Sequence, residues 1–288
     1  MTMLTPTSLA MALDQIEANP GALLLAGGTD VMVEVNERHR TLSVDGQQAV
    51  IALGQVPELT SWTVDLANRR LTLGAGVTWA EIERDPIRSW VPALAEAART
   101  VGSPQIRNAG TVGGNLGTCS PAGDGLPVLA ALEAVVEMVS INGRRSLPVA
   151  EFMVGVKRTG LLPGEIIGAI HLPILDGWQG YSKVGVRNAM VIATASACLA
   201  VDQPSRSIRL ALGSVAPTVV RCPAAEMFAV ESVDWSEMSV TDDVVRRFGA
   251  LAAGSSRPIT DHRSTAEYRR HAVTVMASRL LQRAFPES

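Results

Sequence analysis

Apolar residues recur at helical spacing in several parts of the chain. The segments that predict helices are residues 8–18, 92–101, 241–253 and 264–285. Ser8 precedes the first segment and is a residue type that commonly caps helix N-termini. In the last segment, Ser264 and Glu267 have the spacing of a capping box.

Shorter apolar or alternating segments predict strands. Residues 22–35 predict a buried strand, a glycine turn and a second apolar segment. Residues 60–83 contain a hairpin that turns near Ala67 and Asn68, and residues 126–149 comprise a helix or buried segment and a hairpin with Asn142 and Gly143 at its turn. The other segments of this kind are residues 49–53, 164–174, 181–202 and 207–221. The pattern of apolar and polar positions changes near Asp176 and Gly177. The pattern therefore predicts a mixed α+β chain with a separate C-terminal domain.

Composition limits the possible functions. The chain has 288 residues, of which 47% are hydrophobic, so one large domain or two ordinary ones can each bury a core. A net charge of −3 and only 4% aromatic residues argue against a nucleic-acid partner. No apolar run reaches the length of a membrane span, and the N-terminus lacks the basic region of a signal peptide. We therefore expect a cytoplasmic protein.

The cysteines and lysines are few enough to consider singly. Cys119, Cys198 and Cys222 are odd in number and widely spaced, which excludes a disulfide framework and makes a zinc or iron–sulfur site in this chain unexpected. Of the 25 basic residues, 23 are Arg, so Lys157 and Lys183 stand out, although either can be an ordinary surface residue.

Two glycine pairs carry the main chemical signal. Gly27–Gly28 follows a predicted strand, and Gly113–Gly114 follows a predicted helix and turn. Side chains that can hydrogen-bond come after each pair: Thr29, Asp30, Asn115 and Thr118. Glycine permits positive φ and close approach of the backbone to a ligand, and successive exposed N–H groups bind anions. A tight turn without a ligand is the alternative for each pair.

Other nucleotide and catalytic motifs are missing. The sequence has no GxGxxG after a strand, no phosphate-binding GxxxxGK[ST] segment, no HExxH and no GxSxG. From the residues alone, the prediction is an anionic, nucleotide-like ligand bound between two glycine loops.

The two glycine segments, LLLAGGTDVMVEV (23–35) and IRNAGTVGGNLGTCSPAGDGLPVLAAL (106–132), resemble the FAD-binding medium subunits of the molybdenum hydroxylases. This is the xanthine dehydrogenase and carbon monoxide dehydrogenase family. The resemblance continues through LTLGAGVTWAEIE, GEIIGAIHLP, YSKVGVR, LALGSVAPTVVRC and DHRSTAEYRRHAVTVMASRLLQRA, so it covers nearly the whole chain.

The resemblance implies a specific fold. It is the α+β fold of the vanillyl-alcohol-oxidase type, in which an FAD-binding domain consists of two subdomains. Here that domain is expected to span residues 1–176, with subdomains of about 1–55 and 56–176. Residues 177–288 would form a C-terminal domain of the carbon monoxide dehydrogenase flavoprotein type, with a small antiparallel sheet and helices.

The resemblance also implies roles for particular residues. The backbone N–H groups of one segment would wrap the FAD pyrophosphate: Leu25, Ala26, Gly27, Gly28, Thr29, Asp30 and Val31. Residues of the second would hold it from the other side: Thr111, Gly113, Gly114 and Asn115, with Thr118 and Ser120 also in the site. Asp124 would bond the ribose or a nearby polar group, and Lys183 would lie near the flavin. Val101 and Ile167 would pack against the flavin or adenine rings.

The implied function is electron transfer. The chain would take electrons from two [2Fe–2S] clusters of a small partner subunit, and a large partner subunit would oxidise the substrate at molybdopterin. FAD would pass the electrons to NAD or another acceptor, and the assembly would be a heterotrimer that dimerises. The form of AGGTDVMVEVNERHR (26–40) favours a purine or another N-heterocycle as substrate.

Alternatives remain open. They are a flavin-free scaffold subunit of the same complex, a carbon monoxide dehydrogenase flavin subunit, and a self-contained flavoprotein oxidase or reductase. Two residues depart from the family pattern: Cys119 replaces a small Ala or Ser, and Val191 replaces an acidic residue. Cys119 is expected to act as a small apolar residue rather than a redox thiol.

Overall fold

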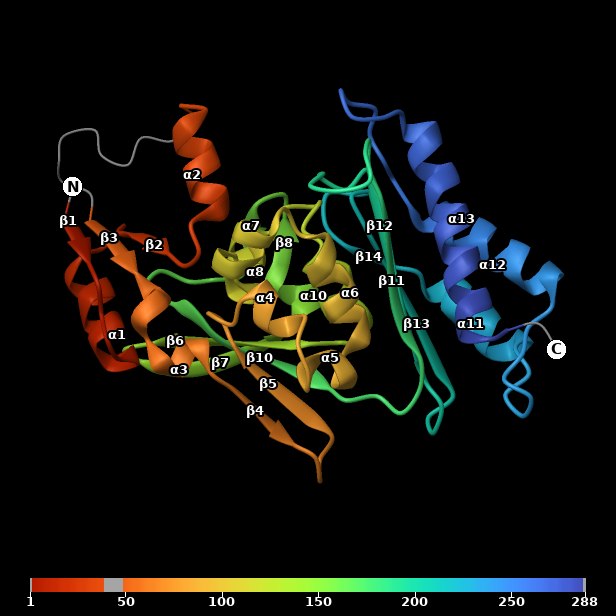
Figure 1. Ribbon diagram of the computed structural model, residues 1–288, viewed down its shortest axis with the longest axis horizontal. Coiled ribbons are helices and arrows are strands. Elements are labelled where there is room, and N and C mark those ends of the chain that lie inside the picture. The colour runs from red at the N-terminus through yellow and green to blue at the C-terminus, as the bar shows by residue number, and fades with distance from the viewer. Residues whose placement is uncertain (1, 39–48, 287–288) are drawn as a thin grey trace.

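The computed structural model describes residues 2–38 and 49–286, in which three groups of elements follow one another from the N-terminus to the C-terminus (Figure 1). His39 and Arg40, at the end of the segment that suggests the substrate, lie outside the described residues. Helices and separate sheets mix along the chain, which confirms the α+β class.

The N-terminal group is a small parallel sheet with two helices. Its elements are β1 (Thr2–Leu4), α1 (Leu9–Ala18), β2 (Leu23–Leu25), α2 (Thr29–Asn36), β3 (Ala49–Ala52) and the 3₁₀ turn η1 (Leu53–Gln55). The strand order is β1-β3-β2. Ser8 caps α1 by accepting a hydrogen bond from the Met11 N–H, as predicted. The strand before the first glycine pair lies at the edge of this sheet and is half-buried, so the expectation of a buried strand was wrong.

The middle group surrounds a five-stranded antiparallel sheet. Its elements are α3 (Pro57–Thr60), β4 (Trp62–Asp65), β5 (Arg70–Gly74), α4 (Trp79–Ile82), α5 (Ile87–Trp90), α6 (Pro92–Thr100), α7 (Pro104–Ala109), α8 (Val112–Thr118), α9 (Gly125–Ala131), β6 (Val135–Ser140), β7 (Gly143–Pro148), α10 (Val149–Phe152), β8 (Met153–Gly155), β9 (Arg158–Thr159) and β10 (Ile166–Pro173). The sheet order is β4-β5-β10-β6-β7, and β8 pairs with β9. Figure 1 shows α4, α6, α7, α8 and α10 gathered over one face of the sheet, while α3 lies toward the N-terminal group.

The C-terminal group is a four-stranded antiparallel sheet backed by three helices. Its elements are β11 (Gln179–Val184), β12 (Ala195–Asp202), β13 (Ser207–Gly213), β14 (Val220–Arg221), α11 (Pro223–Ser232), α12 (Asp242–Ser255) and α13 (Ala266–Ala284). The sheet order follows the chain, β11-β12-β13-β14. The sheet stands between the helices of the middle group and α11–α13 (Figure 1).

The two faces of β12 belong to different hydrophobic cores. Cys198 and Ala200 pack with the core of the middle group, whereas Ala197, Leu199 and Val201 pack with the core beneath α11–α13. Because successive side chains of a strand point to opposite faces, a strand covered on both sides is buried at every position. The interface between the C-terminal sheet and the middle group is therefore an apolar core, and the middle-group helices α6 and α9 pack on the sheet.

Some local features lie at other residues than predicted, and one helix was not predicted. The β6–β7 turn comprises Ile141 and Asn142, one residue earlier than predicted, because Ser140 pairs with Gly143. Helix α11 was not predicted. The cap of α13 is Thr265, whose hydroxyl accepts from the Tyr268 N–H, rather than Ser264. Among residues 2–38 and 49–286, no helix combines the length and apolar character needed to cross a bilayer.

The second glycine pair lies in a helix, so the prediction of a second glycine loop was wrong. Gly113 and Gly114 occupy the first turn of α8, and of the two pairs only Gly28 has positive φ, at 69°. The Gly113 N–H donates to the Ala75 carbonyl at 2.8 Å. This close tertiary contact selects glycine here, and the helix persists in spite of the low helix propensity of the segment.

Candidate functional site

The first glycine pair connects β2 to α2 by a left-handed residue. Gly28 is the N-cap of α2, and its carbonyl accepts from the Met32 N–H at 2.9 Å. A Cβ on Gly27 would lie 1.8 Å from the Ala109 carbonyl oxygen, so its backbone lies directly against the end of α7. The first N–H groups of α2, at Thr29 and Asp30, have no partner within the helix, because the first turn of any helix leaves its donors unpaired.

The second segment meets the first through side chains. Thr111 caps α8 by accepting from the Gly114 N–H at 2.9 Å. Thr118, at the end of the same helix, donates to a carboxylate oxygen of Asp30 at 2.9 Å. The structure thus brings together the two segments that the sequence separates by more than eighty residues. Asp30 and Thr118, polar residues that follow the two glycine pairs, are hydrogen-bonded to each other.

Asn115 projects from α8 with an unused acceptor. Among the described residues its Oδ1 is buried and has no hydrogen-bond partner. Glycine surrounds this amide: a Cβ on Gly123 would lie 2.7 Å from Nδ2, and one on Gly125 would lie 3.0 Å from Oδ1. Buried polar atoms are normally paired, so an orphan acceptor in a glycine-lined place indicates a position for a donor that is not part of the chain.

A buried ion pair lies beside these segments and joins the middle group to the C-terminal sheet. The Lys183 ammonium donates to Asp124 Oδ2 at 2.6 Å and to the Thr100 carbonyl at 3.1 Å. The Tyr181 hydroxyl donates to the other carboxylate oxygen of Asp124 at 2.9 Å. The side chains of Lys183 and Asp124 are only 6% and 8% exposed. Both carboxylate oxygens therefore have a donor from β11.

The environment of this pair shifts its acid–base properties. Burial raises the pKa of the Asp124 carboxyl above its ordinary value, whereas the Lys183 ammonium and the Tyr181 hydroxyl act in the opposite direction. Burial and the Asp124 charge raise the pKa of the Tyr181 phenol well above its ordinary value. The phenol therefore remains protonated and can act as the donor.

The remaining predicted residues lie around the same region. Ile167 is on β10, where a Cβ on Gly117 of α8 would lie 3.9 Å from its Cδ1. Val101 follows α6, and its carbonyl accepts from Arg107 Nη1 at 3.4 Å. The Ser120 hydroxyl accepts from the Ala122 N–H at 3.3 Å in the turn that leads to Asp124. Ile167 thus faces α8, while Val101 lies in the turn before α7 and Ser120 in the turn after α8.

Sequence reasoning missed Tyr181. A signal existed, because Tyr181 and Lys183 are two apart in a predicted strand and therefore share a face. By contrast Lys157, on the surface, pairs with Glu34 at 2.8 Å. Cys119 is 2% exposed and burial raises the pKa of its thiol, as befits a small apolar residue.

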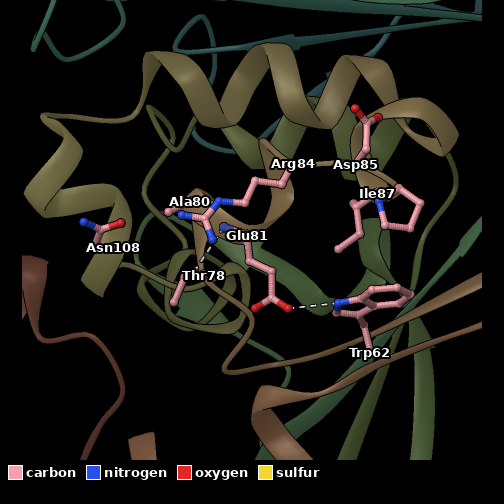
Figure 2. Close-up of a pocket in the computed structure, with 9 residues that line it drawn as sticks. Trp62, Thr78, Ala80, Glu81, Arg84, Asp85, Ile87 and Asn108 are labelled. Atoms are coloured by element: carbon pink, nitrogen blue, oxygen red, sulfur yellow. Dashed lines mark hydrogen bonds between the residues drawn. The ribbon is translucent and has the colours of Figure 1, made fainter.

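Two hollows of the described surface are separate from this arrangement. Figure 2 shows a pocket of about 350 Å³ in which Glu81 accepts a hydrogen bond from the Trp62 indole at 2.9 Å. A groove of about 670 Å³ lies at the outer junction of β10 with the C-terminal sheet and includes His171 and Arg209. None of the residues predicted for FAD lines either hollow.

Comparisons with known families match both parts of the chain. Residues 1–175 match the family described as the FAD binding domain in molybdopterin dehydrogenase. Residues 181–284 match the CO dehydrogenase flavoprotein C-terminal domain. The predicted combination of an FAD-binding domain and a C-terminal flavoprotein domain is thereby confirmed.

Individual relatives extend over nearly the full chain. The glyceraldehyde dehydrogenase medium chain of Sulfolobus acidocaldarius is 31% identical over 284 residues, which cover 97% of this chain and 95% of the relative. The xanthine dehydrogenase FAD-binding subunit of Escherichia coli is 29% identical, with 96% and 93% covered. The carbon monoxide dehydrogenase structure from Hydrogenophaga pseudoflava superposes with a TM-score of 0.88 at 27% identity, with 99% and 96% covered.

The two glycines of the second pair should respond differently to alanine. A Cβ on Gly113 would lie 2.5 Å from both the Cβ and the carbonyl oxygen of Ala75, whereas on Gly114 its nearest neighbour is Thr111 Oγ1 at 3.0 Å. We expect Gly113→Ala to lower the free energy of unfolding by about 1–3 kcal/mol through overpacking. Gly114→Ala should change it by less than about 1 kcal/mol. Urea unfolding of both variants measures the difference, and equal losses would contradict this account of the packing.

Replacing Tyr181 by Phe should destabilise the protein in a pH-dependent way. The variant loses a hydrogen bond to a buried charged acceptor, which contributes about 1.5–3 kcal/mol. A raised folded-state pKa means that Asp124 stabilises the fold below its ordinary pKa of 3.8 and less as pH rises through the folded-state value. Because losing the donor raises the folded-state pKa further, the deficit of the variant should grow as pH rises and be largest near neutrality.

The measurement is urea unfolding of wild type and Tyr181→Phe at a series of pH values from mildly acidic to neutral. Tyr268→Phe is the matched control, since that hydroxyl belongs to a side chain that is 48% exposed. A deficit that stays constant with pH, or that equals the control, would show that Tyr181 does not support the Asp124 carboxylate.

Proposed function

Because the chain belongs to the FAD-binding subunits of the molybdopterin dehydrogenases, we propose that its two glycine segments hold FAD and that it transfers electrons within a multi-subunit molybdenum hydroxylase. Residues 25–31, at the β2–α2 connection, would hold the pyrophosphate with their backbone N–H groups. Thr111, Gly113, Gly114 and Asn115 would line it on the α8 side, where the N–H of Gly113 already donates to Ala75 and that of Gly114 to Thr111, so bare backbone rather than free N–H groups would face the ligand. The contact of Thr118 with Asp30 supports a single site made by both segments.

The observation that carries this proposal is the orphan oxygen of Asn115. Its Oδ1 is a buried acceptor beside bare glycine backbone, and the hydroxyl groups of a dinucleotide are suitable donors. A flavin-free scaffold would gain nothing from an unpaired buried acceptor, which costs about 1–3 kcal/mol when no ligand satisfies it. The residues present therefore fit FAD and favour the flavin subunit over the scaffold.

Asp124 and Lys183 would act on FAD together. Each carboxylate oxygen has lone pairs left after accepting from Tyr181 or Lys183, so Asp124 can still accept from a ribose hydroxyl. Lys183, held by Asp124 and the Thr100 carbonyl, would place a fixed positive charge near the flavin. Val101, Ser120 and Ile167 would complete the site around the rings.

FAD, when bound, supplies redox chemistry that links one-electron and two-electron carriers. The proposed partners are a small subunit with [2Fe–2S] clusters and a large subunit with molybdopterin, in a heterotrimer that dimerises. Support comes from the relatives, which are a medium chain and an FAD-binding subunit. NAD or another acceptor would take the electrons onward.

The substrate proposal is a purine or another N-heterocycle, and its support is the xanthine dehydrogenase relative. Carbon monoxide is a second candidate, favoured by the superposition on carbon monoxide dehydrogenase.

We also propose that the two domains divide between Asp176 and Gly177, in the connection from β10 to β11. The cytoplasmic location stays a prediction, to which the three free buried cysteines lend support.

Replacing Gly114 should weaken FAD binding more than it lowers the stability of the fold. Purified wild type is expected to carry FAD, and Gly114→Ala should raise the Kd for FAD about ten- to a hundredfold, since lost contacts of about 1.4–2.8 kcal/mol scale that way. Gly160→Ala is the control, because the atoms nearest to its Cβ belong to the flexible Leu147 side chain, at 3.3 Å, and to the backbone of Glu151 and Phe152, at 3.7 Å. Titration of the apoprotein with FAD measures both. Wild-type affinity in Gly114→Ala would remove the pyrophosphate assignment.

Iron should be absent from the chain when it is produced alone and present in the complex. Among residues 2–38 and 49–286, no group of three or more His, Cys, Asp or Glu side chains is arranged to hold a metal ion. Metal analysis of the isolated chain and of the co-purified complex tests this expectation. Stoichiometric iron in the isolated chain, or full activity of a lone monomer, would contradict the proposed division of cofactors among the subunits. Screening the complex with xanthine, other N-heterocycles and carbon monoxide separates the substrate candidates.

A further inference from the structure

Arg269 is a buried charge outside the predicted site. It lies in the first turn of α13 and is only 4% exposed. A buried guanidinium is costly unless its donors are paired, and among the described residues Nη1 and Nη2 have partners while Nε has none, so the partners of the two terminal nitrogens indicate what the residue is for. Arg270, the next residue, is exposed. The contrast shows that the fold places one particular arginine of this helix in the interior.

The partners of Arg269 are two backbone carbonyls and one carboxylate. Nη1 donates to the Thr194 carbonyl at 2.6 Å and to the Ser214 carbonyl at 2.9 Å, and Nη2 donates to Asp261 Oδ1 at 2.7 Å. Asp261 is itself oriented by the N–H groups of Arg263 and Ser264. Burial alone would raise the pKa of Asp261, but these backbone donors and Arg269 together lower it. The carboxylate therefore holds the guanidinium in one orientation.

The two residues whose carbonyls Arg269 binds also contact the segments that carry Lys183 and Asp124. The Thr194 N–H donates to the Val184 carbonyl at 2.8 Å, and Val184 is next to Lys183. The Ser214 N–H donates to the Pro121 carbonyl at 2.8 Å, three residues before Asp124. Ser214 has φ of 63°, a left-handed conformation that a residue with a Cβ adopts only when its surroundings impose it.

We propose that Arg269 is a positioning residue, which fixes the ends of β11–β12 and of β13 so that Lys183 and Asp124 meet at the FAD site. A single planar guanidinium can hold two carbonyls and a carboxylate at once, which a lysine ammonium cannot do with the same geometry. This inference rests on the proposed function, because the pair that Arg269 aligns is the one assigned to FAD.

The test compares Arg269→Met, Arg269→Lys and the exposed control Arg270→Met in the full chain and in its complex. We expect Arg269→Met to raise the Kd for FAD about tenfold, equal to about 1.4 kcal/mol. It should also shift the midpoint potential of the bound flavin, because Lys183 is no longer held in place. Arg269→Lys should change the Kd for FAD and the midpoint potential less than Arg269→Met does, and Arg270→Met should change neither quantity. Asp261→Asn, which weakens the hold on the guanidinium without removing it, should shift both in the same direction as Arg269→Met, by less.

Amide hydrogen exchange of the flavin-free chain provides a readout that does not depend on FAD. Faster exchange at Thr194 and Ser214 in Arg269→Met, but not in Arg270→Met, is expected. Unchanged exchange at these amides, or loss of thermal stability with wild-type FAD affinity and potential, would overturn the inference about Arg269. Failure of the wild-type chain to bind FAD would instead overturn the proposed function, so the two failures are distinguishable. If Arg269→Met does not fold, Arg269→Lys and Asp261→Asn decide by the same measurements.

Discussion

The buried pair of Lys183 and Asp124 is the interaction on which the arrangement of the two domains depends. The pair lies between a strand of the C-terminal sheet and the turn before α9, and each member is less than a tenth exposed. Two charges in such a place are tolerated only when further hydrogen bonds satisfy them. The Tyr181 hydroxyl and the Thr100 carbonyl provide these bonds. The C-terminal sheet can therefore dock on the middle group in one orientation.

Apolar packing supports that orientation but does not select it. The face of β12 that carries Cys198 and Ala200 is smooth and made of small side chains, so burial alone would accept small shifts along the strand. Polar contacts remove this freedom at several points of the interface. Tyr181 N–H donates to Glu96 at 2.7 Å, Glu96 also accepts from Arg283 at 3.1 Å, and Gln179 donates to the Trp90 carbonyl at 3.4 Å. Arg269 contacts the Ser214 carbonyl, and the Ser214 N–H in turn donates to Pro121 in the second glycine segment.

Some glycines of the two segments are needed for close packing of the backbone, whereas others leave the backbone open to a ligand. Gly27 and Gly113 have no room for a side chain, because the Ala109 carbonyl and Ala75 lie against them. Gly114 is more open, and its amide is held by the Thr111 cap. The two segments of bare backbone thus bring α2, α7 and α8 together, and under the proposed function they form the surface that binds the dinucleotide. No side chain of the site needs to act as an acid or base, since the redox chemistry belongs to the cofactor.

Local signals in the sequence determined much of the chain: the Ser8 cap, the hairpin at Ala67 and Asn68, the α+β class, and the resemblance that assigns the family. These features depend on residues close together in sequence or on whole motifs. Tertiary structure alone decided the helical state of Gly113 and Gly114, the capture of Asp124 by Tyr181, and the burial of Arg269 beneath two loops. Each arises from contacts between residues separated by tens of positions. Local propensity contains no information about such contacts, because the energy of a buried polar group depends on which distant partner the fold places beside it.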